Sequence, residues 1–387
     1  MHNDVEDGSP PSRPSWIPGP MRPESRRALL LLVVILGGLV LARWTVTGGL
    51  SEPIAPSAPT EPARAGPPAL ALPGSDGTRL TFGGRQVLIL DPHAGGVTRI
   101  PQPPAERIQV WRQGRFTVMV EPREEAWVVP AGRQGPRREL GPVSTVLPAL
   151  EPDRVWLVTS RFGNPEQTYL MDQVQLPGGQ RLARRTLSYR TAPVAVTPQG
   201  VIATDLDDNL VLVNRENGGT RRLAEKAQFV DTHGSLVAWL GTDGLHLVDL
   251  AGGGRRVVQP PSGVPDWLAL GAEALLPAAC CHRMGAFAPD GRSLAVFVRL
   301  AAPSSPGLAV VDADAGTAAA LPGSEGASPT GCLPCLTWSS SGWLFFFAHG
   351  EAVSAVAAWR PGMEDARSLP FDVDAETSAV PTSLTAS

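Results

Sequence analysis

Between about residues 77 and 374, short apolar runs alternate with clusters of turn residues. Each run holds only a few residues, as in "VLIL" at 87–90 and "LVLV" at 210–213, and Gly, Pro, Asn or Asp bounds it. Runs of this length predict β-strands joined by tight turns. Outside residues 28–50, no apolar stretch of about twelve residues follows the 3.6-residue period of a helix. A doubly wound α/β fold is therefore disfavoured.

One phrase recurs along this region: two apolar residues, then Asp or Asn, then Gly four positions later. Its copies are "ILDPHAG" with Asp91, "LVNRENG" with Asn214, "LVDLAGG" with Asp249, "VVDADAG" with Asp312, and a decayed "VAAWRPG" at 356–362. The pattern predicts a hairpin in which the Asx side chain holds the turn and glycine takes a positive φ angle. The strands that follow, such as "VTRI" and "TRRL", suit an outer edge that faces water.

A second phrase precedes the first by about 15–25 residues and consists of a turn, usually with glycine, followed by an apolar run. Its copies are "RQGRFTVMV", "EPDRVWLV", "TPQGVIAT", "THGSLVAW", "APDGRSLAVF" and "SSSGWLFFF". Pro289-Asp290-Gly291 predicts a β-turn between an inner strand that ends at Phe287 and a second strand over 293–298.

The spacing of the two phrases predicts the architecture. Asp91 and Asn214 lie 123 residues apart, which fits three repeats of about 41 residues. The degenerate segments "WVVPAGRQG" and "YLMDQVQLPGG" fall where the missing copies belong. Seven units of about 43 residues then fill the region, each with room for four strands. We predict an all-β seven-bladed β-propeller with four-stranded antiparallel blades.

The segment "FAPDGRSLAVF" at 287–297 resembles the WD40-like (PD40) repeat of the TolB-type β-propeller family. That repeat carries aromatic-Ser-Pro-Asp-Gly before Leu-Ala-aromatic, and Ala288 stands here where the family has serine. "LTWSSSGWLFFF" and "VAVTPQGVIAT" match more loosely. The resemblance implies a propeller that binds partners, although the same fold also carries enzymes.

The N-terminal part predicts a membrane anchor. Residues 28–42 are uncharged and apolar. Residues 43–50 extend this segment to the length of one transmembrane helix, since Trp44 suits the membrane interface and Arg43 can snorkel. Arginines precede it at 13, 22, 26 and 27, so the positive-inside rule places the N-terminus in the cytoplasm and the propeller outside the cell membrane. A cleaved signal peptide, with secretion of the rest, is the alternative.

The predicted domain order follows from these segments and from composition. It is a disordered cytoplasmic tail (1–27), a transmembrane helix that acts as a signal anchor (28–50), a Pro/Ala-rich linker (51–75), the β-propeller (76–374) and a disordered tail (375–387). The 41 glycines and 40 prolines suit a turn-rich chain. The mild net charge of −4 argues against a nucleic-acid partner.

Four cysteines, Cys280, Cys281, Cys332 and Cys335, follow the predicted anchor and would face an oxidising space. Aligning Pro289-Asp290-Gly291 with residues 340–342 superimposes Cys281 on Cys332, in the loops that enter the inner strands of adjacent blades. We predict two disulfides that join these loops by cross pairs and not by a vicinal bond. A metal site that includes His282 and a redox Cys-x-x-Cys are the alternatives.

Two further sets of residues have plain structural interpretations. Asp205, Asp207, Asp208 and Asn209 predict a hairpin between second and third strands, with a calcium site as the alternative. The histidines, His93, His233, His246, His282 and His349, are interpreted as solvated surface residues. No cofactor or metal site is predicted.

The sequence contains no G-x-S-x-G, Walker, H-E-x-x-H or dinucleotide motif. We therefore predict that the protein is not an enzyme but a non-catalytic binding or scaffold module for a protein, peptide or envelope polymer. The channel mouth near the cysteine loops is the preferred binding face, and its candidate residues are His282, Arg283, Leu333 and Pro334. The alternatives are a cell-envelope propeller enzyme of the lyase, glycosidase or quinoprotein type, with its site in the channel, and signalling through a partner.

Overall fold

The computed structural model describes most of the chain from Gly77 onward. The described residues are 72, 75, 77–100, 108–121, 125–132, 136–161, 168–188, 190–267, 283–301, 305–327, 335–349, 354–372 and 383–387. The chain divides into two units, Met1–Arg64 and Ala65–Ser387, and the first lies wholly outside the described residues. The description below concerns the second unit.

Seven antiparallel sheets, here called blades 1 to 7, make up this unit. Blade 1 contains β29 (Ser383–Ala386), β1 (Leu80–Gly83), β2 (Val87–Leu90) and β3 (Val97–Ile100), and blade 2 contains β4 (Gln109–Gln113), β5 (Phe116–Val120), β6 (Glu125–Pro130) and β7 (Arg138–Pro142). Blade 3 contains β8 (Thr145–Pro148), β9 (Arg154–Arg161), β10 (Thr168–Gln175) and β11 (Arg181–Ser188), and blade 4 contains β12 (Thr191–Thr197), β13 (Gly200–Asp205), β14 (Leu210–Asn214) and β15 (Thr220–Ala224). Blade 5 contains β16 (Gln228–His233), β17 (Leu236–Gly241), β18 (Gly244–Asp249) and β19 (Arg255–Val258). Blade 6 contains β20 (Asp266–Trp267), β21 (Gly285–Phe287), β22 (Ser293–Arg299), β23 (Pro306–Asp312) and β24 (Thr317–Ala320), and blade 7 contains β25 (Leu336–Trp338), β26 (Leu344–His349), β27 (Ser354–Trp359) and β28 (Arg367–Asp372).

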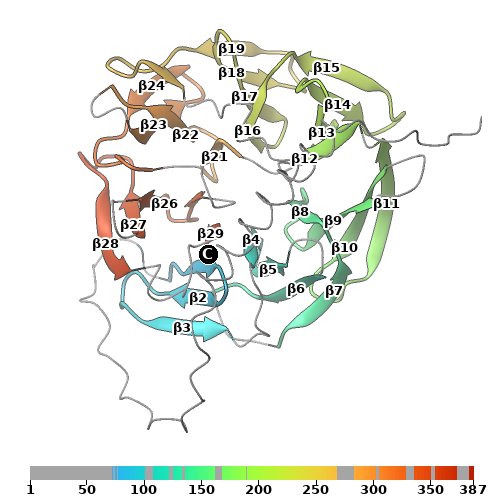
Figure 1. The fold of residues 1–387 in the computed structure, drawn as a ribbon, viewed down its shortest axis with the longest axis horizontal. Helices are drawn as coiled ribbons and strands as arrows, with labels where there is room; N and C mark the ends of the chain where they lie inside the picture. Colours follow the sequence, from blue (N-terminus) through green and yellow to red (C-terminus); the bar gives the residue numbers. More distant parts are fainter. Residues whose placement is uncertain are drawn as a thin grey trace, which may run out of the picture. The chain divides into compact units, whose positions relative to one another are not determined.

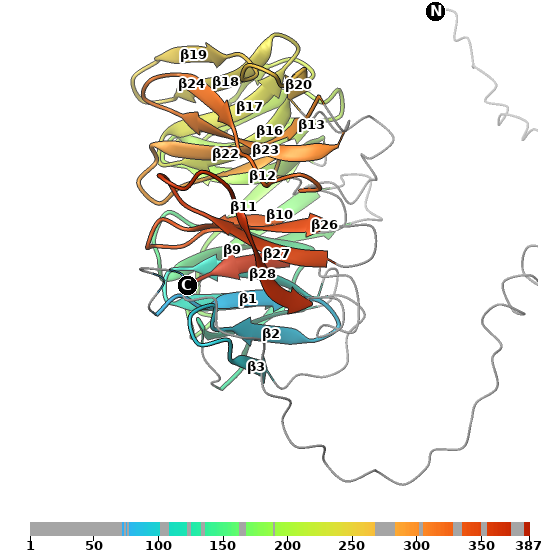
Figure 2. The same cartoon turned by 90° about the vertical axis from the view of Figure 1, so that its left-hand side faces the viewer.

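The blades close into a ring, and we use the term central channel for the region around its axis, which the first strands surround. The first strands of the blades contact one another in the order β29, β4, β8, β12, β16, β21, β25 and back to β29. Figure 1 shows this ring along its axis, and Figure 2 shows the strands crossing its thickness. Every element among the described residues is a strand. The predicted seven-bladed propeller is therefore confirmed for this part of the chain.

The turns have the geometry that the two repeated phrases predict. At Asp91, the side-chain Oδ1 accepts hydrogen bonds from the N–H groups of His93 and Ala94, and Gly95 has a φ of 72°. Asn214, Asp249 and Asp312 hold equivalent turns between third and fourth strands. Gly291 has the same positive φ in the turn between β21 and β22.

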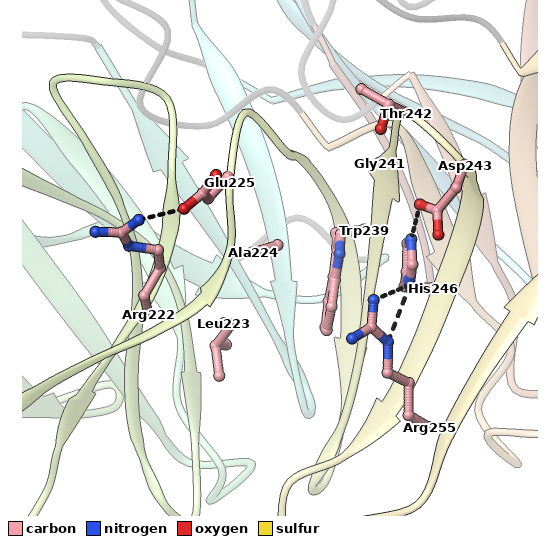
Figure 3. A pocket seen from close by; sticks show the side chains of 10 residues that line it. All are labelled: Arg222, Leu223, Ala224, Glu225, Trp239, Gly241, Thr242, Asp243, His246 and Arg255. Atoms are coloured by element: carbon pink, nitrogen blue, oxygen red, sulfur yellow. Dashed lines mark hydrogen bonds and ion pairs between the residues drawn. The ribbon is translucent and has the colours of Figure 1, made fainter.

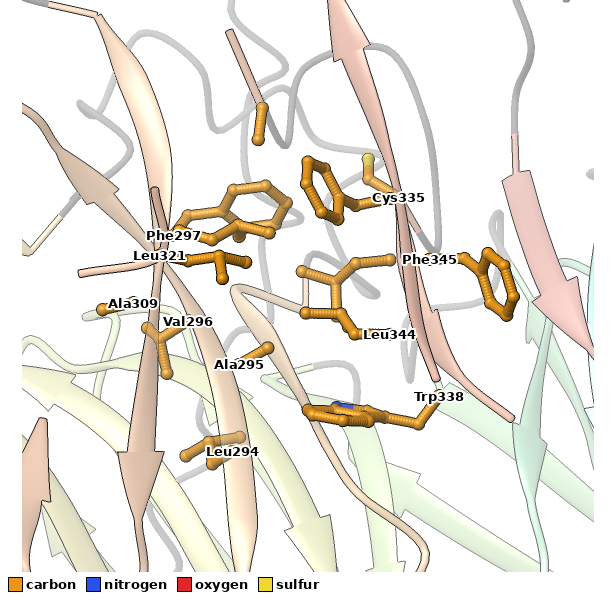
Figure 4. Packing of buried hydrophobic residues seen from close by; sticks show 14 of the residues in the cluster. Leu294, Ala295, Val296, Phe297, Ala309, Leu321, Cys335, Trp338, Leu344 and Phe345 are labelled. Atoms are coloured by element: carbon orange, nitrogen blue, oxygen red, sulfur yellow. The ribbon is translucent and has the colours of Figure 1, made fainter. Parts of the chain in front are cut away.

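The hydrophobic core lies between the blades, because each middle strand has apolar side chains on both faces. All five residues of β5 are buried, whereas the outer strand β15 exposes its first three residues. Between blades 6 and 7, Leu294 and Phe297 pack in one cluster with Trp338 and Leu344, as Figure 4 shows. Burial of such side chains from two neighbouring sheets stabilises the ring by the hydrophobic effect.

The C-terminal strand closes the ring, and this corrects the predicted disordered tail at 375–387. Strand β29 pairs with β1 in antiparallel register from Leu80↔Ala386 to Gly83↔Ser383, and all four of its residues are buried. The hydroxyl Oγ of Ser383 also accepts a hydrogen bond of 2.7 Å from the N–H of Val110 in blade 2. The propeller therefore extends past residue 374 to the last residues of the chain.

Two further features bear on the predicted organisation. The inner edge of blade 6 is split between β20 and β21, which both pair with β22. The segment 268–282 between them lies outside the described residues, as does the predicted anchor at 28–50. Of the predicted linker at 51–75, only Leu72 and Ser75 are described. Within the described part of the chain, no helix is long and apolar enough to cross a bilayer.

Candidate functional site

The ring has two faces that the strand order defines. We call the turn face the side that carries the turns between first and second and between third and fourth strands. We call the loop face the opposite side, which carries the hairpins between second and third strands and the loops that lead into the inner strands. Arg283 and Cys335, which come just before the inner strands β21 and β25, lie on the loop face.

Arg283 is the one predicted binding residue that the structure describes, and it reaches into the central channel. Its Nη1 donates to Oδ1 of Asp231 on β16 at 3.1 Å. Its guanidinium carbon also lies 5.6 Å from the ring centroid of Trp111 on β4, within the range of a cation–π contact. Blades 7 and 1 separate blades 6 and 2 around the ring, so this second contact crosses the channel.

The Asp231 carboxylate is buried and fully engaged. Only 7% of its side chain is exposed, and its Oδ2 accepts a hydrogen bond of 2.8 Å from the N–H of Phe287 on β21. Burial raises the pKa of Asp231, and the charge of Arg283 opposes that rise. The ion pair therefore ties the inner strand of blade 5 to that of blade 6.

The other residues predicted from the sequence have mixed outcomes. His282, Leu333, Pro334, Cys280, Cys281 and Cys332 lie outside the described residues. Cys335 is described, is buried, and directly precedes the inner strand β25. Its place agrees with the predicted position of the cysteine loops, while the disulfide pairing stays a prediction.

A cleft of about 310 Å³ opens on the loop face between blades 4 and 5. Blade 4 contributes Arg222 and Glu225 near the end of β15, and blade 5 contributes Trp239, His246 and Arg255. Figure 3 shows the two walls facing each other, with Asp243 and Thr242 at the rim. The volume lies at the lower end of the range for small-molecule sites, about 300–1,000 Å³.

His246 is the central polar residue of this cleft. Its ring stacks on Trp239 with centroids 5.4 Å apart. Arg255 donates to Nδ1 from Nη2 at 3.0 Å and from Nε at 3.3 Å, so the proton must be on Nε2, which lies 2.6 Å from Oδ1 of Asp243. The hydrogen bond from His246 lowers the pKa of Asp243. Both ring nitrogens of His246 are therefore occupied.

The burial of His246 corrects its interpretation as a solvated surface residue. The residue is 1% exposed. Leu245 and Leu247 point to the opposite face of the middle strand β18 and are buried too, so both faces of this strand are covered. His93 and His233 are exposed, as predicted. The sequence signal for the burial of His246 is its place inside an apolar run of a middle strand. Asp231 in "FVDTH" likewise follows two apolar residues of a strand, and sequence reasoning missed that signal.

Neither the cleft around His246 nor the Arg283–Asp231 pair has the features of a metal centre. Among the described residues, no three His, Cys, Asp or Glu side chains lie close enough to hold one metal ion. The Asp205 carboxylate accepts hydrogen bonds from the backbone N–H groups of Asp207 and Asn209, at 2.9 and 2.8 Å. These bonds hold the turn between β13 and β14. The predicted hairpin is thus confirmed there.

Comparisons with known proteins support the fold. No protein-family model and no curated protein matches the chain. Among solved structures, an oligogalacturonate lyase in complex with manganese is similar with a TM-score of 0.53, 12% identity, and coverage of 75% of this chain and 88% of that chain. An acylaminoacyl peptidase from Pyrococcus horikoshii has a TM-score of 0.53, 9% identity, and coverage of 75% of this chain and 48% of that chain.

TolB from Acinetobacter baumannii is also similar, with a TM-score of 0.42, 12% identity, and coverage of 80% of this chain and 66% of that chain. The chain thus spans about half the length of the peptidase and just under two thirds of TolB. At identities this low, the likeness to the lyase and to the peptidase shows a shared fold and nothing about activity. The PD40 character of the repeats stays a prediction.

Proposed function

We propose that this protein is a non-catalytic binding module that presents the loop face of its propeller to a protein or peptide outside the membrane. The observation that carries this proposal is that His246 and Asp231, two buried titratable side chains of this part of the ring, are each held by hydrogen bonds to other protein groups. A general base needs a free lone pair within reach of the substrate proton. Both nitrogens of His246 and both carboxylate oxygens of Asp231 are already engaged.

The loop face also offers features that suit recognition. The cleft between blades 4 and 5 combines apolar wall residues, Leu223 and Ala224, with charged groups at its rim. Arg222 and Glu225 at the rim are well exposed and pair with each other at 2.5 Å. A partner side chain that enters the cleft would meet both apolar and polar groups, as anchor residues of protein interfaces do.

The alternative, an envelope enzyme of the lyase type, draws on the similar oligogalacturonate lyase, which was solved with manganese. Incubation of the full chain with oligogalacturonate and manganese tests it directly. We expect no unsaturated product. Product formation that the metal stimulates would contradict the non-catalytic proposal.

The binding proposal is tested by placing a photo-crosslinking amino acid on each face of the full chain in cells. Thr242 is an exposed residue in a hairpin of the loop face, and Asn217 is an exposed turn residue of the turn face in the neighbouring blade. We expect a discrete adduct with a protein or peptide from position 242 and none from position 217. Equal yields from the two positions, or no adduct from position 242, would contradict the proposal.

A further inference from the structure

Three arginines from two blades meet at a second cleft, which lies on the turn face between blades 3 and 4. Arg154 begins β9, Arg185 lies on β11, and Arg215 follows β14. The cleft has a volume of about 100 Å³. This is well below the range of whole-molecule sites, so it suits a single functional group of a ligand.

The charges of this cleft are not balanced by the protein. The Glu151 carboxylate is the one acidic group that lines it, and Oε1 accepts from Nη1 of Arg154 at 3.3 Å. Gln173 donates to the other carboxylate oxygen at 3.4 Å. In the described part of the chain, neither Arg185 nor Arg215 has a carboxylate partner, so two positive charges stay uncompensated.

The two uncompensated arginines, Arg185 and Arg215, line the same small cleft. Arg185 lies over the buried Trp156, with its guanidinium carbon 5.7 Å from the ring centroid. Partial burial lowers the pKa of Arg185, and the nearby charge of Arg215 lowers it further. The Nε of Arg154 is also buried and has no hydrogen-bond partner among the described residues. Such an arrangement costs free energy unless an anion occupies the cleft.

We propose that the cleft formed by Arg154, Arg185 and Arg215 binds a phosphate group, either as free phosphate or as the monoester end of a larger ligand. A phosphate monoester carries about −1.5 to −2 charges near neutral pH, which matches the two uncompensated arginines. Guanidinium groups also bind phosphate through paired N–H donors. The site lies on the turn face and is independent of the binding proposed for the loop face.

Calorimetric titration of the full chain with inorganic phosphate tests this proposal, and glycerol phosphate in a second arm separates free phosphate from a monoester end. We expect Arg215→Gln to weaken phosphate binding about tenfold, as loss of one charge-assisted hydrogen bond predicts. Arg215 is exposed, so this variant should fold. Arg185→Gln should weaken binding similarly, and its unfolding transition shows whether the variant is intact.

Arg221→Gln is the matched control. Arg221 is an exposed arginine of the neighbouring strand β15 and does not line the cleft. This variant should bind phosphate as the parent does. Equal loss of affinity in Arg221→Gln and Arg215→Gln would show nonspecific attraction and overturn the proposal. Absence of phosphate binding by the parent protein would also overturn it.

Discussion

At the scale of single residues, the Arg283–Asp231 pair shows how the ring fixes a buried charge. Arg283 comes from blade 6, Asp231 from blade 5 and the stacking partner Trp111 from blade 2. A buried ion pair contributes little net stability compared with apolar residues of the same size, but removal of one member leaves a buried charge without a partner. Replacement of one member of the pair should therefore lower the stability of the protein strongly, whereas replacement of both members should lower it much less.

We predict that Arg283→Met lowers the free energy of unfolding by about 3–5 kcal/mol, because the Asp231 carboxylate stays buried and unpaired. Urea unfolding followed by tryptophan fluorescence measures the change. Arg292→Met is the control. Arg292 forms a long ion pair of 3.9 Å with Asp314, and both side chains are largely exposed, so its loss should cost little. The double variant Arg283→Met with Asp231→Asn should regain most of the loss. A double variant as unstable as the single one would contradict the role given to Asp231.

The same pair predicts a pH dependence. Burial raises the pKa of Asp231 in the folded protein above its unfolded value, which is about 3.9. Stability from protonated Asp231 is thus fully present below the unfolded pKa and is lost as pH rises through the folded pKa. Removal of Arg283 raises the folded pKa further, so the cost of Arg283→Met should grow from acidic to neutral pH. Unfolding curves at several pH values test this, and a cost independent of pH would be inconsistent with it.

Residue contacts of this kind could be predicted from the sequence only in part. The turn residues Asp91, Asn214 and Gly291 have local roles, and the repeated phrases identified them. Arg283 was identified because its loop belongs to the channel mouth. Asp231 and Trp111 were missed because their partner Arg283 lies on another blade, and the pairing depends on how the ring closes. His246 was named but wrongly interpreted as a surface residue.

At the scale of secondary-structure elements, β29 closes the ring by pairing the last strand of the chain with β1, the first described strand. The short segment "SLTA" has one strongly apolar residue, and its partner β1 lies about 300 residues earlier. Strand prediction relies on local pattern, so the sequence could not reveal this pairing. The hairpins within blades were predictable for the opposite reason, since their strands are neighbours along the chain.

We predict that Ser383→Ala lowers the free energy of unfolding by about 1–3 kcal/mol, because the buried N–H of Val110 loses its acceptor. Deletion of 383–387 should have a larger effect, since β1 then loses its inner neighbour. Thermal unfolding measures both changes. Ser262→Ala is the control, because Ser262 lies exposed in a turn. A deletion variant with the melting temperature of the parent would contradict a closing role for β29.

The loops that lead into β21 and β25 carry the predicted disulfides. We predict that peptides with Cys280 or Cys281 stay linked to peptides with Cys332 or Cys335 in the unreduced protein. Reduction of such bonds should lower stability by about 2–4 kcal/mol. Mass spectrometry of unreduced digests, compared with reduced ones, identifies the links. Accessible thiols in the native protein, or a bond between Cys280 and Cys281, would contradict this prediction.

At the scale of the whole molecule, repeat period and turn chemistry were enough to predict seven blades. Four strands per unit follow from a length of about 43 residues, and a ring is the way such units bury both faces of every blade. The position of the functional surface could not be predicted equally well. It depends on which loops converge in space, and the cleft around His246 is lined by residues of two different blades.

The last prediction concerns where the propeller lies in the cell. Residues 28–42 are apolar, and the arginines that precede them predict a cytoplasmic N-terminus. We therefore expect the full chain to remain with membranes after a carbonate wash and external protease to degrade the propeller in intact spheroplasts. Replacement of Leu30, Leu31 and Leu32 by Asp should release the protein from the anchor, since each charge within the apolar core costs about 2.5–3.5 kcal/mol. A tag at the N-terminus, protected from the same protease, is the internal control. A propeller that resists protease in intact spheroplasts but is degraded after they are lysed would lie in the cytoplasm, where the four cysteines would be reduced.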